Sequence, residues 1–188
     1  MKTRHTFALI ACVLFGVNAR ASEIARWCGA NDNGPATRTF AVIDERRAWR
    51  EYPDVKSIPE LEPDVGSGYA QIWLAHDGNI LVRVAEPGQD FWVYTAYCFD
   101  NAGSLIYLGY QLRTAWKWGF REEGSFKKGR LNPERPEFFS TETGQPIAKP
   151  EQAADVPDAL KPHICPTKAA LPFFKLLSRP ASKPKGTN

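Results

Sequence analysis

The sequence has 188 residues, of which 43% are hydrophobic and 24% are charged, with 24 Lys and Arg against 21 Asp and Glu. A chain of this length fits one domain with a short tail, and these fractions exclude a wholly disordered, collagen-like or coiled-coil chain. No apolar run reaches the roughly 18 residues of a membrane-spanning helix, which excludes a multi-span membrane protein.

The first 21 residues have the three parts of a secretory signal peptide. Lys2 and Arg4 give a basic start, residues 7–17 form an apolar stretch, and the segment ends in Ala-Arg-Ala. The apolar stretch is too short to span a bilayer comfortably, and it continues beyond Cys12, which disfavours a lipoprotein cleavage site there. We therefore expect cleavage after Ala21, export to the periplasm or the medium, and no transmembrane span in the remaining chain.

Cleavage would change the charge of the protein. The leader carries three basic and no acidic residues, so the remaining chain has 21 of each and no net charge. Proteins that bind nucleic acid through phosphate contacts need a basic excess or a basic face, so we expect no nucleic-acid partner. Acidic residues dominate from Ser22 to Tyr110 and basic residues from Gln111 onward, which indicates either a partner-facing end or two halves that fold against each other.

Three cysteines remain after the leader, in a compartment that would be oxidising. Cys98 lies in an apolar, strand-like run where a free thiol packs as a small hydrophobic group, whereas Cys28 and Cys165 lie in irregular segments. We expect a Cys28–Cys165 bridge that ties the ends of the domain together, with Cys98 as the alternative partner of either. There is no Cys-x-x-Cys pair, so neither a redox motif nor a zinc ribbon is predicted.

The first predicted element after the leader is a helix within residues 39–52. Apolar residues recur along this stretch, and Pro53 would end the helix. A short strand at 40–43 followed by one helical turn is the alternative. Residues 53–68, with three prolines and two glycines, are typical of a connector.

A series of strands follows, rich in β-branched and aromatic residues. Linkers of four residues, each with a glycine, separate the first four and are short enough for hairpins. The predicted strands span residues 69–75, 80–86, 91–100, 105–113 and 115–120, with a sixth at 137–141. Sequential hairpins predict an antiparallel meander.

The C-terminal third of the chain is different, because it holds ten of the 15 prolines and so cannot supply central strands. We expect a helical turn or two within residues 151–160 and a short helix at 169–178. This last helix would pack one or more of Phe173, Phe174 and Leu177 on the sheet.

Together these elements predict an α+β fold. It would be a single antiparallel β-meander of five to six strands, with an N-terminal helix and the proline-rich C-terminal segment packed on it. The predicted domain spans residues 22–178, and a disordered tail follows at 179–188.

The sequence carries no catalytic signature. It has no Gly-x-Ser-x-Gly, no His-Glu-x-x-His, no phosphate-binding loop and no Rossmann glycine pattern, so we predict no catalytic residue, no cofactor and no metal site. Asp100, Glu122 and Glu123 lie near strand ends. Two carboxylates about 5–9 Å apart across a sugar would make a glycosidase, although acids in turns usually act as caps.

Aromatic residues are concentrated in the middle of the chain, where residues 69–126 hold 13 of the 21 that follow the leader. Trp116, Trp118 and Phe120 alternate and would share one face of a strand, with basic residues on the other face. An exposed face of this kind suits sugar stacking or the docking of an anionic partner, whereas a buried one is ordinary core. The predicted ligand-binding residues are Arg113, Trp116, Lys117, Trp118 and Arg121.

These observations predict a small, exported, non-catalytic protein that binds a glycan, an anionic surface or a protein partner through an aromatic and basic sheet edge. A hydrolase of envelope polysaccharide, acting through acidic residues near the sheet edge, is one alternative. A structural envelope assembly factor without a ligand is another.

Overall fold

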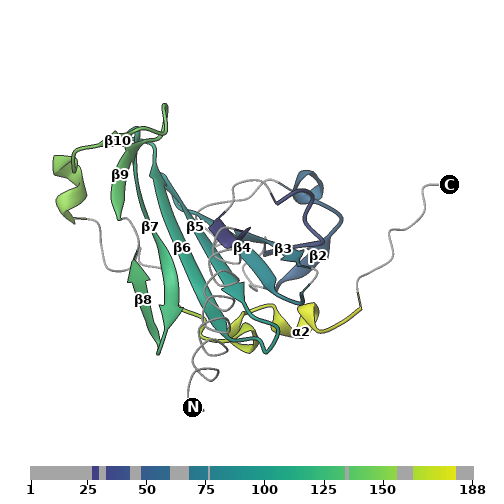
Figure 1. Cartoon of the computed structure of the whole chain (residues 1–188). Helices are drawn as coiled ribbons and strands as arrows, with labels where there is room; N and C mark the ends of the chain where they lie inside the picture. Colours follow the sequence, from purple (N-terminus) through teal and green to yellow (C-terminus); the bar gives the residue numbers. More distant parts are fainter. Residues whose placement is uncertain are drawn as a thin grey trace, which may run out of the picture.

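The computed structural model describes residues 27–29, 33–42, 48–59, 68–75, 77–133, 136–155 and 163–180. These residues form one antiparallel sheet of ten strands, accompanied by a few short helices (Figure 1). The predicted leader and residues 181–188 of the predicted tail lie outside the described residues. Across the described part of the chain, no helix is long and apolar enough to cross a membrane.

The strands lie in the order β10-β9-β7-β6-β5-β4-β3-β1-β2, with β8 also paired to β7 (Figure 1). Their bounds are β1 Arg38–Val42, β2 Arg50–Tyr52, β3 Gly68–Leu74, β4 Ile80–Pro87, β5 Phe91–Phe99, β6 Leu105–Thr114, β7 Trp118–Lys127, β8 Arg130–Pro133, β9 Glu137–Ser140 and β10 Pro146–Ile147. The short helices are the 3-10 turns η1 Val55–Ser57, η3 Glu151–Asp155 and η5 Lys168–Ala170, the α-helix α2 Phe174–Leu177, and a helical turn at residues 27–29.

The predicted meander is confirmed from β3 to β6, where each strand pairs antiparallel with the next. The connecting turns are built by local polar contacts. The backbone N–H of Ser104 donates to Asp100 Oδ1 at 2.8 Å, and Gly78 and Gly103 both take a φ of 84°, which glycine adopts without steric strain. Short turns of this kind fix the register of the hairpins.

The described residues of the stretch 39–52 contradict the predicted N-terminal helix, because they form strands. Arg38–Val42 forms strand β1, in agreement with the first half of the alternative reading, and Arg50–Tyr52 forms the edge strand β2. All five residues of β1 are buried, so the sequence lacks the alternation of apolar and polar residues that marks a half-buried strand. Residues 43–47, where the alternative places a helical turn, lie outside the described residues.

The sheet is also larger than the five or six strands predicted. The run expected at 115–120 is the beginning of β7, which starts at Trp118 and continues to Lys127, and β8, β9 and β10 follow it. These last three strands have only two to four residues each, and prolines lie in or beside them, so their sequences resemble loops. The fold is therefore β-rich, with few and short helices, in place of the α+β layout predicted.

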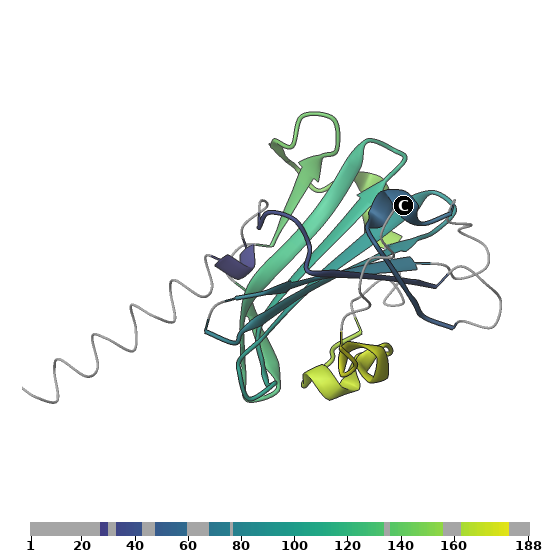
Figure 2. The same cartoon turned by 90° about the vertical axis from the view of Figure 1, so that its right-hand side faces the viewer.

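The two faces of the sheet are covered differently (Figure 2). We call the face under residues 163–180 the C-terminal face, and the opposite face, which carries Cys98, the disulfide face. The Phe40 and Phe173 rings stack on the C-terminal face with their centroids 5.4 Å apart. The C-terminal segment thus packs on the sheet as predicted, although it contains the two short helices η5 and α2 in place of one helix.

The predicted Cys28–Cys165 bridge is wrong. Cys28 is bonded to Cys98, and Cys165 is a buried free thiol. The sheet explains this pairing: Cys98 projects from β5 onto the disulfide face, where the turn at residues 27–29 lies, whereas Cys165 belongs to the core of the C-terminal face. The two cysteines that were expected to pair therefore lie on opposite sides of the sheet.

Candidate functional site

A gap among the side chains of the disulfide face marks the candidate site. Ala96 of β5 and Gly109 of β6 lie directly opposite each other, and neither has a side chain that rises far above the sheet. Arg83 of β4 lies opposite Ala96, and Glu123 of β7 lies opposite Gly109. Because residues paired across a sheet share a face, a cation and a carboxylate flank the gap, with their Cα atoms about 14 Å apart at the usual strand spacing.

This gap is the floor of a depression of about 500 Å³, which we call the central groove. Its lining residues are Cys28, Gly29, Arg83, Tyr94, Thr95, Ala96, Tyr107, Gly109, Tyr110, Gln111, Arg121, Glu123 and Glu137. A β-carbon built on Gly109 would lie 3.5 Å from that of Ala96 and 3.6 Å from the Tyr107 ring, which are ordinary contact distances. The packing around Gly109 therefore leaves room for a side chain, and does not itself require an open floor.

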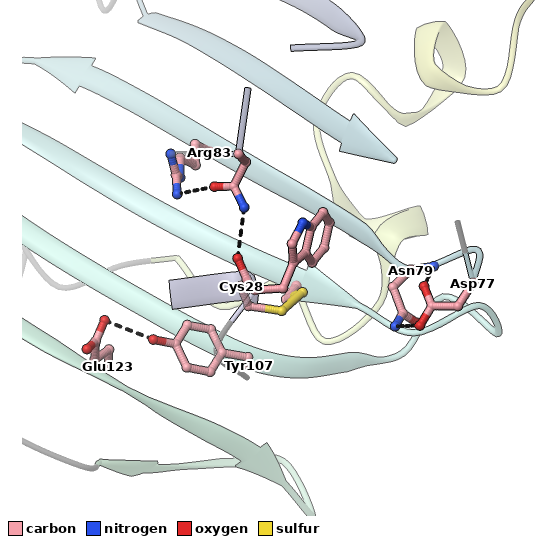
Figure 3. Close-up of a disulfide and its surroundings, with 9 residues drawn as sticks. Cys28, Asp77, Asn79, Arg83, Tyr107 and Glu123 are labelled. Carbon is pink, nitrogen blue, oxygen red and sulfur yellow. Dashed lines mark hydrogen bonds between the residues drawn. A yellow bond between two sulfur atoms is a disulfide. The ribbon is translucent and has the colours of Figure 1, made fainter. Parts of the chain in front are cut away.

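The disulfide builds one end of the central groove (Figure 3). It holds the N-terminal helical turn against β5, where a β-carbon on Gly29 would lie only 2.9 Å from the Tyr107 hydroxyl oxygen. Asn33 braces the same segment, because its Nδ2 donates to the Trp27 carbonyl at 2.8 Å and its Oδ1 accepts from Arg83 at 2.7 Å. The end of the groove is thus held by both covalent and polar contacts.

The Trp73 ring of β3 also holds Arg83 in place. Its guanidinium carbon lies 5.0 Å from the centre of the Trp73 ring, a favourable cation–π arrangement. Burial lowers the pKa of Arg83 and nearby Tyr107 raises it, but an arginine starts so far above neutral pH that it stays charged. The groove therefore has a fixed positive charge on its β4 side.

The charged side chains of the groove are balanced within it. Tyr107 Oη donates to Glu123 Oε2 at 2.8 Å, and Arg121 Nε donates to Glu137 Oε1 at 2.6 Å across β7 and β9. With Arg83, the lining holds two basic and two acidic side chains. The groove thus presents hydrogen-bonding groups without a net charge.

An aromatic cluster extends the site along β5. The Trp92 and Tyr94 rings stack with centroids 6.0 Å apart, and Tyr69 of β3 packs against Trp92 at 6.4 Å. Burial raises the pKa of Tyr94, against the lowering effect of Arg113. The Tyr94 hydroxyl is therefore protonated at neutral pH and remains a hydrogen-bond donor.

A second depression, of about 360 Å³, lies beyond this cluster, and we call it the distal pocket. Its lining residues are Gly88, Gln89, Asp90, Phe91, Trp92, Tyr94, Arg113, Thr114, Ala115 and Thr141. Arg113 Nη2 donates to the Thr141 carbonyl at 3.0 Å, which orients the guanidinium among these residues. Tyr94 lines both depressions, so the two adjoin.

Two of the five predicted ligand-binding residues line these depressions. Arg113 lines the distal pocket, and Arg121 lines the central groove. Trp116 and Lys117 lie instead in the turn between β6 and β7, where Trp116 is 59% exposed and Lys117 pairs with Glu142 at 3.0 Å. The expectation that Trp116 shares a strand face with Trp118 is therefore wrong.

Trp118, the fifth predicted residue, points to the other side of the sheet. It packs on the C-terminal face in a cluster with Phe120 and Phe138. Its buried indole nitrogen has no hydrogen-bond partner among the described residues. These rings form core, in agreement with the alternative interpretation of the aromatic stretch.

The predicted acidic candidates are not brought together. Asp100 caps the turn between β5 and β6 through its contact with Ser104, and Glu122 and Glu123 are neighbours on β7 that point to opposite faces. Glu123 instead shares the central groove with Glu137, which sequence analysis placed only at the start of a sixth strand.

The groove floor was not predicted, although the sequence contains a signal for it. Ala96 and Gly109 are small residues in the middle of long strands, where β-branched and aromatic residues prevail, and glycine inside a strand often marks close approach of a ligand or another backbone. Their juxtaposition depends on the β5–β6 register, which shifts at Cys98 and Phe99. That shift was not readable from the sequence.

Among the described residues, no group of three or more His, Cys, Asp or Glu side chains is arranged to hold a metal ion. No family model, no curated protein and no solved structure matches the chain. Its function therefore has to be argued from the chemistry of the site.

Proposed function

We propose that this is an exported, non-catalytic carbohydrate-binding protein, and that an oligosaccharide lies in the central groove. The observation that carries the proposal is the open floor over Ala96 and Gly109, enclosed by paired polar side chains and adjoined by an aromatic cluster. Concave sites that combine aromatic walls with a few fixed polar groups are typical of small-ligand binding.

The groups around the groove suit a neutral ligand rich in hydroxyls. The half-buried Trp92 and Tyr94 rings offer apolar surface to the C–H face of a sugar ring. Gln111, Arg121 and Glu137 supply hydrogen-bond donors and acceptors on the same face. Because these groups stand on paired strands, they are held in place before the ligand arrives, which reduces the entropic cost of binding.

The charge balance favours an uncharged ligand over the anionic surface or acidic partner that the sequence also suggests. An anion attracted by Arg83 or Arg121 would also meet Glu123 and Glu137, because all four line the groove. Repulsion of this kind discriminates against charged competitors. The lining of the distal pocket likewise contains one basic and one acidic side chain, Arg113 and Asp90.

The hydrolase alternative has less support. Glu123 and Glu137 share the groove, but the first accepts a hydrogen bond from Tyr107 and the second is in an ion pair with Arg121. A glycosidase needs one carboxyl group held protonated in an apolar setting as the general acid. Neither glutamate is in such a setting, so we expect binding without turnover.

The disulfide supports export. Bridges such as Cys28–Cys98 persist in oxidising compartments outside the cytosol. Together with the leader expected at residues 1–21, it favours the periplasm or the medium as the place where the protein acts.

Titration calorimetry with linear malto-, cello- and chito-oligosaccharides tests the proposal, with heparin as an anionic comparison. We expect at least one of the neutral series to bind with one-to-one stoichiometry, heparin not to bind, and chromatography to show no shortened products. If none of the three neutral series binds, or if the chains are cleaved, the proposal is wrong.

A variant that fills the groove floor tests whether the oligosaccharide binds there. Gly109→Val would put two methyl groups over Ala96, so we expect it to weaken oligosaccharide binding about tenfold or more while circular dichroism shows an intact sheet. Ser125→Val is the matched control, because Ser125 lies in β7 on the same face but outside both depressions. It should bind like the wild type.

A further inference from the structure

We infer that the central groove and the distal pocket are one continuous site that takes the end of a linear, uncharged oligosaccharide, with the chain terminus against the disulfide-anchored turn. The inference rests on the proposed function. It adds the length of the ligand and the recognition of a chain end in preference to the chain interior.

The length follows from the strand geometry. Tyr107 and Arg113 both point to the disulfide face from β6 and lie at opposite ends of the combined site. The six residue steps between them correspond to about 20 Å of extended strand. A disaccharide is shorter than this span, so only a longer chain reaches from Tyr107 to Arg113 across both depressions, which adjoin at Tyr94.

One end of the site is closed. Cys98 lies directly opposite Tyr107, its disulfide is fully covered, with Cys28 1% and Cys98 0% exposed, and Gly29 is pressed against the Tyr107 hydroxyl. Figure 3 shows Tyr107 pointing from β6 toward Glu123 beside this turn. A sugar chain that runs along β6 toward Tyr107 therefore meets a wall that is bonded to the sheet.

The other end of the site lies at the margin of the sheet. The distal pocket is lined there by the β4–β5 turn, which contains Gln89, and the β6–β7 turn, which contains Ala115. Gln89 and Ala115 are exposed, and the backbone N–H of Ala115 donates to the Asp90 carbonyl at 2.8 Å, so the remainder of a longer chain has a path outward over the two joined turns. The asymmetry of the two ends predicts that the chain enters in one direction only.

Affinity as a function of chain length tests the first property. For the neutral series that binds, we expect the dissociation constant to fall about tenfold or more from the disaccharide to the tetrasaccharide or pentasaccharide and then to level off. Arg113→Ala should weaken hexasaccharide binding severalfold and weaken disaccharide binding much less, because a disaccharide covers only part of the site. Lys127→Ala, an exposed position outside both depressions, is the matched control.

Blocking the ends of the chain tests the second property. The hexasaccharide is titrated with free ends, with a bulky aromatic tag on its reducing end, and with a bulky acetal on its non-reducing end. We expect one of the two tags to weaken binding about tenfold or more and the other to leave it within about twofold. If both tagged hexasaccharides bind as tightly as the free one, the site has no closed end. If both tags weaken binding equally, the site has no open end.

These experiments distinguish a failure of the extended site from a failure of the carbohydrate-binding function. If a disaccharide binds as tightly as a hexasaccharide and Gly109→Val abolishes binding, the carbohydrate-binding function stands and the extended site is wrong. If no neutral oligosaccharide binds at any length, both are wrong.

Discussion

Arg38 joins three parts of the chain through one guanidinium. It donates to both carboxylate oxygens of Glu51 on β2, at 2.7 and 2.9 Å, and to the backbone carbonyls of Leu176, Leu177 and Arg179 at 2.9–3.0 Å. Its side chain is only 7% exposed. Removing one partner of a buried ion pair leaves the other charge uncompensated, so this arginine holds the end of α2 to the sheet.

We predict that Arg38→Ala lowers the free energy of unfolding by about 3–5 kcal/mol, measured by urea denaturation. Arg130→Ala, at an exposed position in β8, should change it by no more than about 0.5 kcal/mol. Equal stabilities of the two variants would show that Arg38 does not anchor the C-terminal segment.

Cys165 should be chemically inert in the folded protein. Burial raises the pKa of its thiol, and only the thiolate reacts with alkylating reagents. We predict that iodoacetamide at pH 8 leaves Cys165 unmodified until urea is added, as read by peptide mapping. Because the pKa is raised in the folded state, the stability gained by burying the neutral thiol is lost as the pH rises through the unfolded and then the folded value. Rapid native labelling would contradict the buried position.

At the scale of elements, the β5–β6 hairpin contains a glycine that lowers its stability. Glycine inside a strand costs about 0.5–1 kcal/mol relative to alanine, yet Gly109 occupies a central position with room for a β-carbon. We predict that Gly109→Ala raises the melting temperature. Gly129→Ala should lower it, because Gly129 has a φ of 76° that alanine resists. A lower melting temperature for Gly109→Ala would mean that the packing around this position requires glycine, which would contradict the prediction.

The anchored N-terminal turn is the second element that stability measurements can test. The Cys28–Cys98 bridge closes 70 residues of sequence, which corresponds to about 4 kcal/mol in the chain-entropy model. We predict a loss of about 2–5 kcal/mol in a Cys28→Ala, Cys98→Ala double variant, together with weaker oligosaccharide binding because the end of the groove is released. Unchanged affinity in a folded double variant would show that the turn is not part of the site.

At the scale of the whole molecule, the sequence predicted the parts of the fold that depend on local signals. The strands around Leu81, Val93 and Leu108 alternate or are flanked by glycine turns, so their pairing followed from the sequence. The N-terminal helix was wrong because Phe40 and its neighbours are all buried, which removes the alternation. The disulfide was wrong because the sheet side of Cys98 and Cys165 depends on register and on the path of distant segments.

The candidate site was less predictable than the fold. Arg113 and Arg121 were predicted from their spacing along one stretch of sequence, although they stand on the separate strands β6 and β7. Ala96, Gly109 and Glu137 come together only through pairings across four strands. Trp116 was misplaced because the chain turns one residue later, at Lys117, which has a φ of 68°. A gap made by small side chains produces no periodic pattern in a single sequence. Only the register of the strands shows which small residues are neighbours.

The export prediction concerns the whole chain and is independent of the site. If residues 1–21 are a leader, the protein recovered from the periplasm or the medium after expression in a bacterium should begin at Ser22, as read by intact mass. Recovery of the full-length chain with Met1 from the cytosol would contradict it.

Backbone NMR during titration with the binding hexasaccharide tests the central claim most directly. The account predicts that the largest amide shift changes fall on Ala96, Gly109 and Gln111 along β5 and β6, with little change at Phe173 on the opposite face. Shift changes confined to the C-terminal face would contradict it.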